Sequence, residues 1–128
     1  MTRKDLELAI ENVVSFGDTD IFPYPMETHV FHDLRDRTVE LLEQIHASFD
    51  TYLTTSPPTH LNALSPVGHT GFRWSTQLDP IWNLYVLAAV IALGRDIEAA
   101  RLPVDRQIVF SYRFDPDSTT GQIFGSRI

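Results

Sequence analysis

The sequence contains no cysteine, which excludes disulfide bonds and thiolate-bound metals and is compatible with a reducing compartment. It also lacks a Gly-x-Ser-x-Gly nucleophile motif and a glycine-rich phosphate-binding loop, so nothing supports a serine hydrolase of that kind or a P-loop triphosphatase. Charged residues interrupt the first ten positions, where an export signal would need an apolar run. We therefore expect a cytoplasmic protein.

Basic residues are scarce in the first half of the chain. The formal net charge is −7, and residues 1–72 contain four Lys or Arg against eleven Asp or Glu, whereas residues 73–128 contain six of each. A nucleic-acid-binding protein that works alone usually has a basic surplus, so the charge argues against that role for the first half. The 128 residues, 43% of them hydrophobic, predict one globular domain over residues 1–128.

The stretch from Asp79 to Phe114 organises the predicted fold. Asp79 can cap a helix, and Pro80 suits its first position. From Pro80 to Gly94 no side chain is charged, and apolar side chains fall on nearly every side of the helix, which predicts burial. This uncharged run is too short for a membrane span of about 20 residues, so no membrane is expected. Charged residues follow, and Pro103 prevents further helix.

The fold class predicted from these patterns is α+β, with three main helices packed on a small antiparallel sheet. Besides the helix from Pro80, apolar residues recur at helical spacing over Lys4 to Val14 and over Asp33 to Leu53. Residues 57–71, which are rich in proline and glycine, are expected to form a long connection. The expected strands or hairpin segments are residues 72–78, 107–114 and 121–125.

One polar cluster suggests a metal site, namely Asp18, Asp20 and Glu27 with His29 and His32. Carboxylates with imidazoles can bind zinc, which would make the chain a small metal-dependent hydrolase. The spacing does not fit a calcium-binding EF-hand loop. Turn-capping aspartates and ordinary histidines explain the same residues, so we assign no metal ligand.

Exposed aromatic side chains can stack on nucleic-acid bases, and Phe72, Trp74, Trp82 and Tyr85 are candidates for such a platform. Their helix and strand periodicity favours core packing instead. Glu98 and Arg101 are three residues apart on a helix and can form an ion pair. Apolar and mostly polar side chains alternate over residues 107–114, which predicts a strand with one apolar, largely aromatic face and one more polar face.

Four segments occur in the order found in a known family: GDTDIFPYPME at Gly17–Glu27, GFRWSTQLDPIWNLY at Gly71–Tyr85, IEAAR at Ile97–Arg101 and VFSYRF at Val109–Phe114. From about Asn12 to Phe124 the chain resembles the N-terminal region of bacterial RNA-directed DNA polymerases (reverse transcriptases) linked to antiphage defence. The resemblance implies that residues 1–128 form an N-terminal extension and the start of the polymerase fingers. Their helices would support the polymerase, and a strand would lie near template or incoming nucleotide. Arg101, Arg106 and Arg113 are then candidates for contacts to nucleic-acid phosphates. Arg113 lies on the polar face of the predicted strand, where it could equally be solvated.

In such polymerases a strand with a metal-binding aspartate and a tyrosine-x-Asp-Asp turn follow this region, and they hold the magnesium ions of phosphoryl transfer. This sequence has no Asp-Asp pair, and Asp18 and Asp20 do not match the catalytic positions. We therefore expect no catalytic residue, no metal ligand and no polymerase activity in this chain alone. Magnesium, RNA and DNA are expected only for the complete enzyme.

The resemblance leaves three origins open: a truncated product, an excised segment or the first piece of a split gene. The expected partner is the remainder of the polymerase. A different class of function, a stand-alone acidic protein-interaction module, fits the net charge and the apolar helix from Pro80. The DNA that follows the coding sequence would distinguish the polymerase segment from the interaction module. Only the polymerase segment predicts a continuation that encodes the metal-binding aspartates.

Overall fold

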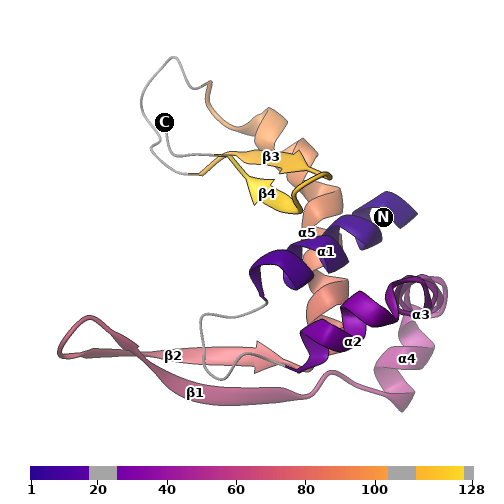
Figure 1. Cartoon of the computed structure of the whole chain (residues 1–128), viewed down its shortest axis with the longest axis horizontal. Helices are drawn as coiled ribbons and strands as arrows, with labels where there is room; N and C mark the ends of the chain where they lie inside the picture. Colours follow the sequence, from indigo (N-terminus) through magenta and orange to yellow (C-terminus); the bar gives the residue numbers. More distant parts are fainter. Residues whose placement is uncertain (18–25, 104–111, 126–128) are drawn as a thin grey trace.

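A computed structural model describes residues 1–17, 26–103 and 112–125 of the chain (Figure 1). The described residues form five helices and two separate two-stranded antiparallel sheets, so the α+β class is confirmed. In chain order the elements are α1 (Arg3–Phe16), α2 (Glu27–Asp33), α3 (Arg35–Ala47), α4 (Phe49–Thr55), β1 (His60–Val67), β2 (Gly71–Leu78), α5 (Pro80–Ala100), β3 (Phe114–Asp117) and β4 (Gln122–Phe124).

Helix α5 runs through the middle of the molecule, and α1 lies across it (Figure 1). The predicted cap is confirmed, because the Asp79 carboxylate accepts a hydrogen bond from the Trp82 amide at 3.1 Å and Pro80 takes the first helical position. One hydrophobic core joins α1, α2, α3, α5 and β4. Its largest fully buried side chains are Ile10, Val13, Val39, Leu42 and Leu84.

The single helix predicted over Asp33 to Leu53 is wrong, because the segment divides among α2, α3 and α4. Leu34 and Ser48 take non-helical dihedral angles, with φ −113° and ψ 33° at Leu34 and φ −131° and ψ 42° at Ser48. The break at Ser48 redirects the chain so that Phe49 stacks on Tyr85 of α5, with ring centroids 5.6 Å apart. Tertiary packing therefore overrides a continuous local pattern.

The connection predicted over residues 57–71 is also wrong, because residues 60–67 form β1. This strand pairs with β2 from His60↔Leu78 to Val67↔Gly71, and Gly68 turns the hairpin with a φ of 70°. Pro66 fits within β1 because each strand of a two-stranded ribbon has an open edge. We call residues 60–78 the arm, which extends away from the helices (Figure 1). The predicted strand at 72–78 is confirmed within it.

The second sheet packs near the C-terminal end of α5 and beside α1 (Figure 1). Phe114, the last residue of the strand predicted over 107–114, begins β3, whereas residues 107–111 lie outside the described part of the chain. The predicted partner at 121–125 is confirmed as β4. The expected single sheet is not formed by the described residues, since β2 and β3 belong to different sheets.

Candidate functional site

Two of the three arginines predicted to contact phosphate meet on one carboxylate. Glu98 Oε2 accepts hydrogen bonds from Arg101 Nη1 at 3.0 Å and from the Phe114 amide at 3.1 Å. Arg113 Nη1 lies 2.7 Å from Glu98 Oε1, close enough for an ion pair although the pair does not meet hydrogen-bond geometry. We call these residues the Glu98 cluster. Arg106 lies outside the described residues.

The Glu98 cluster joins the end of α5 to the start of β3. Arg101 Nη1 also donates to the Tyr112 carbonyl at 2.8 Å, and Arg113 Nη2 donates to the Leu102 carbonyl at 2.6 Å. Although partial desolvation opposes the shift, the Phe114 amide and the two guanidinium groups hold the pKa of Glu98 below its ordinary value. The Arg113 side chain is only 15% exposed, so the cluster acts as a structural clamp in this arrangement.

The four candidate aromatic side chains separate into two environments. Trp82 and Tyr85 pack with Phe49, and the Trp82 indole donates to the Ser56 carbonyl at 2.9 Å, so core packing is confirmed for this pair. Phe72 and Trp74 are 71% and 74% exposed on the arm, so core packing is wrong for them. The sequence pattern could not distinguish the pairs because burial depends on which element covers each side chain.

The suggested metal cluster is only partly described, since Asp18 and Asp20 lie outside the described residues. Nδ1 of His32 lies 3.0 Å from a carboxylate oxygen of Asp33, its sequence neighbour. Within the described ranges, no group of three or more metal-ligating side chains comes together. Nothing in the described geometry therefore favours the metal hydrolase.

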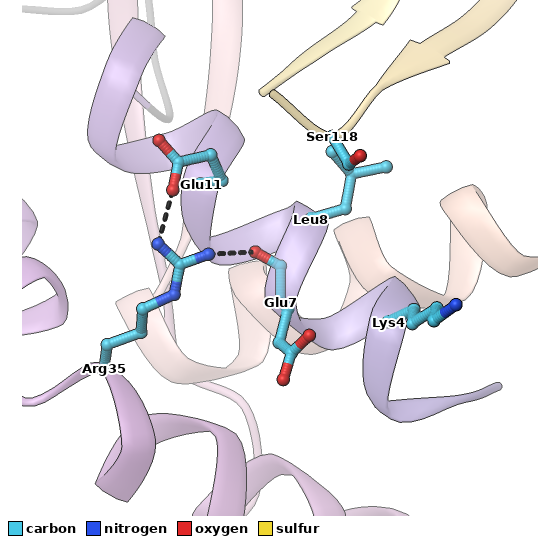
Figure 2. Close-up of a pocket in the computed structure, with 6 residues that line it drawn as sticks. All are labelled: Lys4, Glu7, Leu8, Glu11, Arg35 and Ser118. Carbon is cyan, nitrogen blue, oxygen red and sulfur yellow. Dashed lines mark hydrogen bonds and ion pairs between the residues drawn. The ribbon is translucent and has the colours of Figure 1, made fainter. Parts of the chain in front are cut away.

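A hollow of about 260 Å³ lies between α1, α3 and the β3–β4 turn (Figure 2). Its walls include Lys4, Glu7, Glu11 and Arg35. Arg35 forms an ion pair with Glu11 and donates to the Glu7 carbonyl at 3.4 Å. The bond from Arg35 holds the pKa of Glu11 below its ordinary value, against the effect of burial. The Arg35 guanidinium is thus paired with a carboxylate of α1 and links α3 to α1. Because this positive charge is already neutralised, the hollow is a poor anion site.

The largest departure from the sequence prediction is on α5, which is buried on one face only. Ala88 and Ile91 face the core, but four aliphatic side chains on the other face remain 44–58% exposed. We call these residues the α5 stripe: Val86, Val90, Leu93 and Ile97. Their spacing of four, three and four residues places them on one side of a helix. The sequence contains this spacing, but apolar residues also occupy the other faces of the helix, so the pattern did not single out an exposed stripe.

By length and composition α5 could also cross a membrane. The core helix of a soluble protein meets the same criteria. Its N-terminal turns pack on α4, its middle packs against α1, and its last turns contain Arg95, Asp96 and Glu98. One face of α5 thus lies in the protein core, and charged side chains lie near its C-terminal end.

No protein-family model, curated protein or solved structure matches this chain.

Proposed function

We propose that this chain is the N-terminal portion of a bacterial RNA-directed DNA polymerase of the antiphage-defence type. In this proposal it supports the catalytic part of the enzyme and does not itself carry out phosphoryl transfer. The observation that carries the proposal is the α5 stripe, because an apolar face of the central helix stays about half exposed and no described helix or strand covers it. The segments at Gly71–Tyr85 and Ile97–Arg101, which carry the family resemblance, include the two ends of α5 and one stripe residue, Ile97.

Covering the α5 stripe would favour docking. Fully burying an aliphatic side chain of this size contributes about 1.5–3 kcal/mol, so covering four half-exposed ones would contribute about 3–6 kcal/mol before the entropic cost of association. The partner that best fits is the remainder of the polymerase, which would add the missing layer.

The same proposal assigns the chemistry to the remainder of the enzyme. The aspartates that hold magnesium, and with them the contacts to RNA and DNA at the reaction centre, would come from the segment that follows. Arg101 and Arg113 would contact phosphate only if a phosphate group displaced Glu98, whereas Arg106 stays a candidate for such a contact. A cytoplasmic location is part of the proposal.

The first experiment is to sequence the DNA that follows this coding region. We expect a reading frame, continuous or reached by a frameshift, that encodes the metal-binding aspartate strand and the tyrosine-x-Asp-Asp turn. This continuation is then coexpressed with the chain, and nucleotide incorporation is measured with an RNA template, a DNA primer and magnesium. The two polypeptides should copurify and extend the primer, whereas this chain alone should not.

The stripe is tested in the same assay. The double variant Val90→Asp and Leu93→Asp should reduce copurification and extension at least tenfold, because two charges would be buried at the interface. The control is Ala47→Asp with Thr51→Asp, which adds the same charge at two exposed positions away from the stripe. Extension by the continuation alone at the full rate, or equal losses in both variants, would contradict the proposal.

The stripe also favours the acidic protein-interaction module, since any partner with an apolar face could cover it. This alternative predicts unrelated DNA downstream. It further predicts that the Val90→Asp and Leu93→Asp variant loses a partner that is not a polymerase segment. The downstream sequence therefore separates the two functions before any protein is made.

A further inference from the structure

We propose that the arm joins two copies of this chain, the aromatic face of one arm packing on the aromatic face of the other. This proposal goes beyond the polymerase assignment and does not depend on it, since the α5 stripe and the arm are separate surfaces. It rests on the cross-strand register, the exposure of the face and the distribution of charge.

The register places the bulky side chains of the arm on one face. In an antiparallel ribbon, residues opposite each other across the strands share a face, and side chains alternate between faces along each strand. The pairs Leu64↔Trp74 and Pro66↔Phe72 therefore lie on the same face. Leu64 is also exposed, and in the described residues no helix or sheet covers this group. We call these four residues the aromatic face.

One polar pair beside the aromatic face is hydrogen-bonded within the arm. The Thr76 hydroxyl donates to the Asn62 side chain at 2.8 Å, directly beside Leu64 and Trp74 in the register. The base of the arm is fixed by Asp79, whose carboxylate accepts from the Thr59 amide at 2.9 Å. The face thus needs an apolar cover and no specific polar partner. A second copy of the same face supplies that cover, as a two-fold interface requires.

Charge favours a second copy over other occupants. Between Asp50 and Asp79 the chain contains no acidic residue, although the whole chain contains 17. The only Lys or Arg in this interval is Arg73, which the register places on the opposite face of the arm. Two copies with a net charge of −7 repel one another over most of their surface, and they can approach most easily through the acid-free arms.

The composition argues against single-stranded nucleic acid as the occupant. Nucleic-acid grooves combine stacking aromatics with several cations, and binding weakens as salt rises. The aromatic face has stacking side chains but no Lys or Arg, whereas depletion of both signs of charge with enrichment of aromatics is typical of protein interfaces. The two occupants therefore predict opposite responses to salt.

The aromatic face is smaller than a standard protein–protein interface. Aromatic side chains bury about 150–250 Å² each, so two of them with Leu64 and Pro66 fall short of the roughly 800 Å² per partner of a standard interface. We expect a weak dimer with a dissociation constant in the range of roughly 10–100 μM. Salt should strengthen it by screening the repulsion between the acidic bodies.

The experiment is sedimentation equilibrium of the full chain over a wide concentration range at low and at high salt. The wild-type protein should change from monomer to dimer, and Trp74→Lys should weaken the dimer at least tenfold. Leu61→Lys is the matched control, because Leu61 is 67% exposed on the same ribbon but on the opposite face. Circular dichroism of each variant checks that the fold is retained.

Fluorescence gives a second readout that does not depend on a substitution at the face. The chain has two tryptophans, Trp82 in the core and Trp74 on the arm, so a concentration-dependent blue shift reports burial of Trp74. A monomer at all concentrations, equal effects of the two lysine variants, or a dimer that dissociates as salt rises would overturn the proposal. Saturable binding of a labelled single-stranded RNA oligonucleotide that Trp74→Lys abolishes would overturn it too.

Discussion

The Asp79 carboxylate connects two elements at the root of the arm. One oxygen accepts the Trp82 amide and caps α5, while the other accepts the Thr59 amide, and the Asp79 amide itself donates to the Thr59 carbonyl at 3.0 Å. A single side chain thus pairs with an otherwise unpaired helix amide. It also joins the residue before β1 to the residue after β2 at the base of the arm. Its removal should affect both elements together.

The variant Asp79→Ala should lower the free energy of unfolding by about 1–2 kcal/mol, because a helix cap and a second hydrogen bond are lost. Urea denaturation followed by circular dichroism measures the change. The matched control is Asp96→Ala, which removes an exposed aspartate from the same helix. Similar losses of unfolding free energy in the two variants would show that the hydrogen bonds of Asp79 add no stability beyond the effect of its charge.

Glu98 gives a prediction that depends on pH. Its pKa is lowered in the folded chain, so its contribution to stability is full above the ordinary glutamate pKa of about 4.3 and is lost as the pH falls through the folded pKa. The variant Glu98→Gln should therefore be less stable than the wild type near neutral pH, and the difference should shrink as the pH falls from above the ordinary glutamate pKa toward pH 3.

Urea midpoints of the wild type and of Glu98→Gln at several pH values test this. Other acids titrate in both proteins, so their effects cancel in the difference. Glu40→Gln, at an exposed position of α3, is the control and should give a small difference at every pH. A Glu98→Gln difference that stays constant down to pH 3 would contradict the clamp described for Glu98.

At the residue scale, the sequence predicted the interactions that are local in the chain. The Asp79 cap and the Glu98–Arg101 pair involve residues three positions apart, and both are present. The second partner of Glu98 is Arg113, which is distant in the sequence and meets it only because β3 packs on the end of α5. No rule of sequence spacing predicts a contact between residues so far apart. The sequence alone therefore left Arg113 without a carboxylate partner, which favoured a phosphate contact.

At the scale of elements, close approach between α5 and the β3–β4 hairpin depends on Gly94. A Cβ atom at this position would lie 2.6–2.7 Å from ring atoms of Phe114, well inside van der Waals contact. Phe114 also packs edge-on against Phe124, with ring centroids 6.4 Å apart. The hairpin can therefore lie on α5 because the helix has no side chain there.

The variant Gly94→Ala should destabilise the protein by about 1–3 kcal/mol, although alanine is the better helix former by about 1 kcal/mol. Thermal or urea denaturation measures the loss. In a Phe114→Ala background the clash is absent, so the same Gly94→Ala substitution should be neutral or stabilising. This reversal of sign separates a packing conflict from a change in helix propensity, and its absence would contradict the contact.

Element types were predicted better than element limits. The helix from Pro80 and the strands at 72–78 and 121–125 carry strong local signals, and all three are present. The strand β1 was missed because Pro57, Pro58 and Pro66 resemble loop punctuation, whereas a two-stranded arm tolerates proline at an edge. The burial of Val90 and Leu93 was overestimated for a related reason, since an apolar pattern does not say whether a covering element exists.

At the scale of the whole molecule, charge and exposed apolar surface act against each other. The net charge of −7 keeps copies apart near neutral pH, while the α5 stripe and the aromatic face favour association. The isoelectric point is about 5.0, so the repulsion vanishes as the pH falls toward that value. The exposed apolar surface should then determine how the protein behaves.

We therefore expect the wild-type protein to become turbid near pH 5 and to clear near pH 8. The double variant Leu93→Glu and Ile97→Glu should stay clear over a wider range around pH 5, because it interrupts the α5 stripe with charge. The control Ala47→Glu with Thr51→Glu adds the same two charges on α3 and α4. Since both variants shift the isoelectric point equally, turbidity measured at each variant's own isoelectric pH isolates the stripe. Equal turbidity there would mean that the stripe contributes nothing to association, which would remove the physical basis for a docking partner on α5.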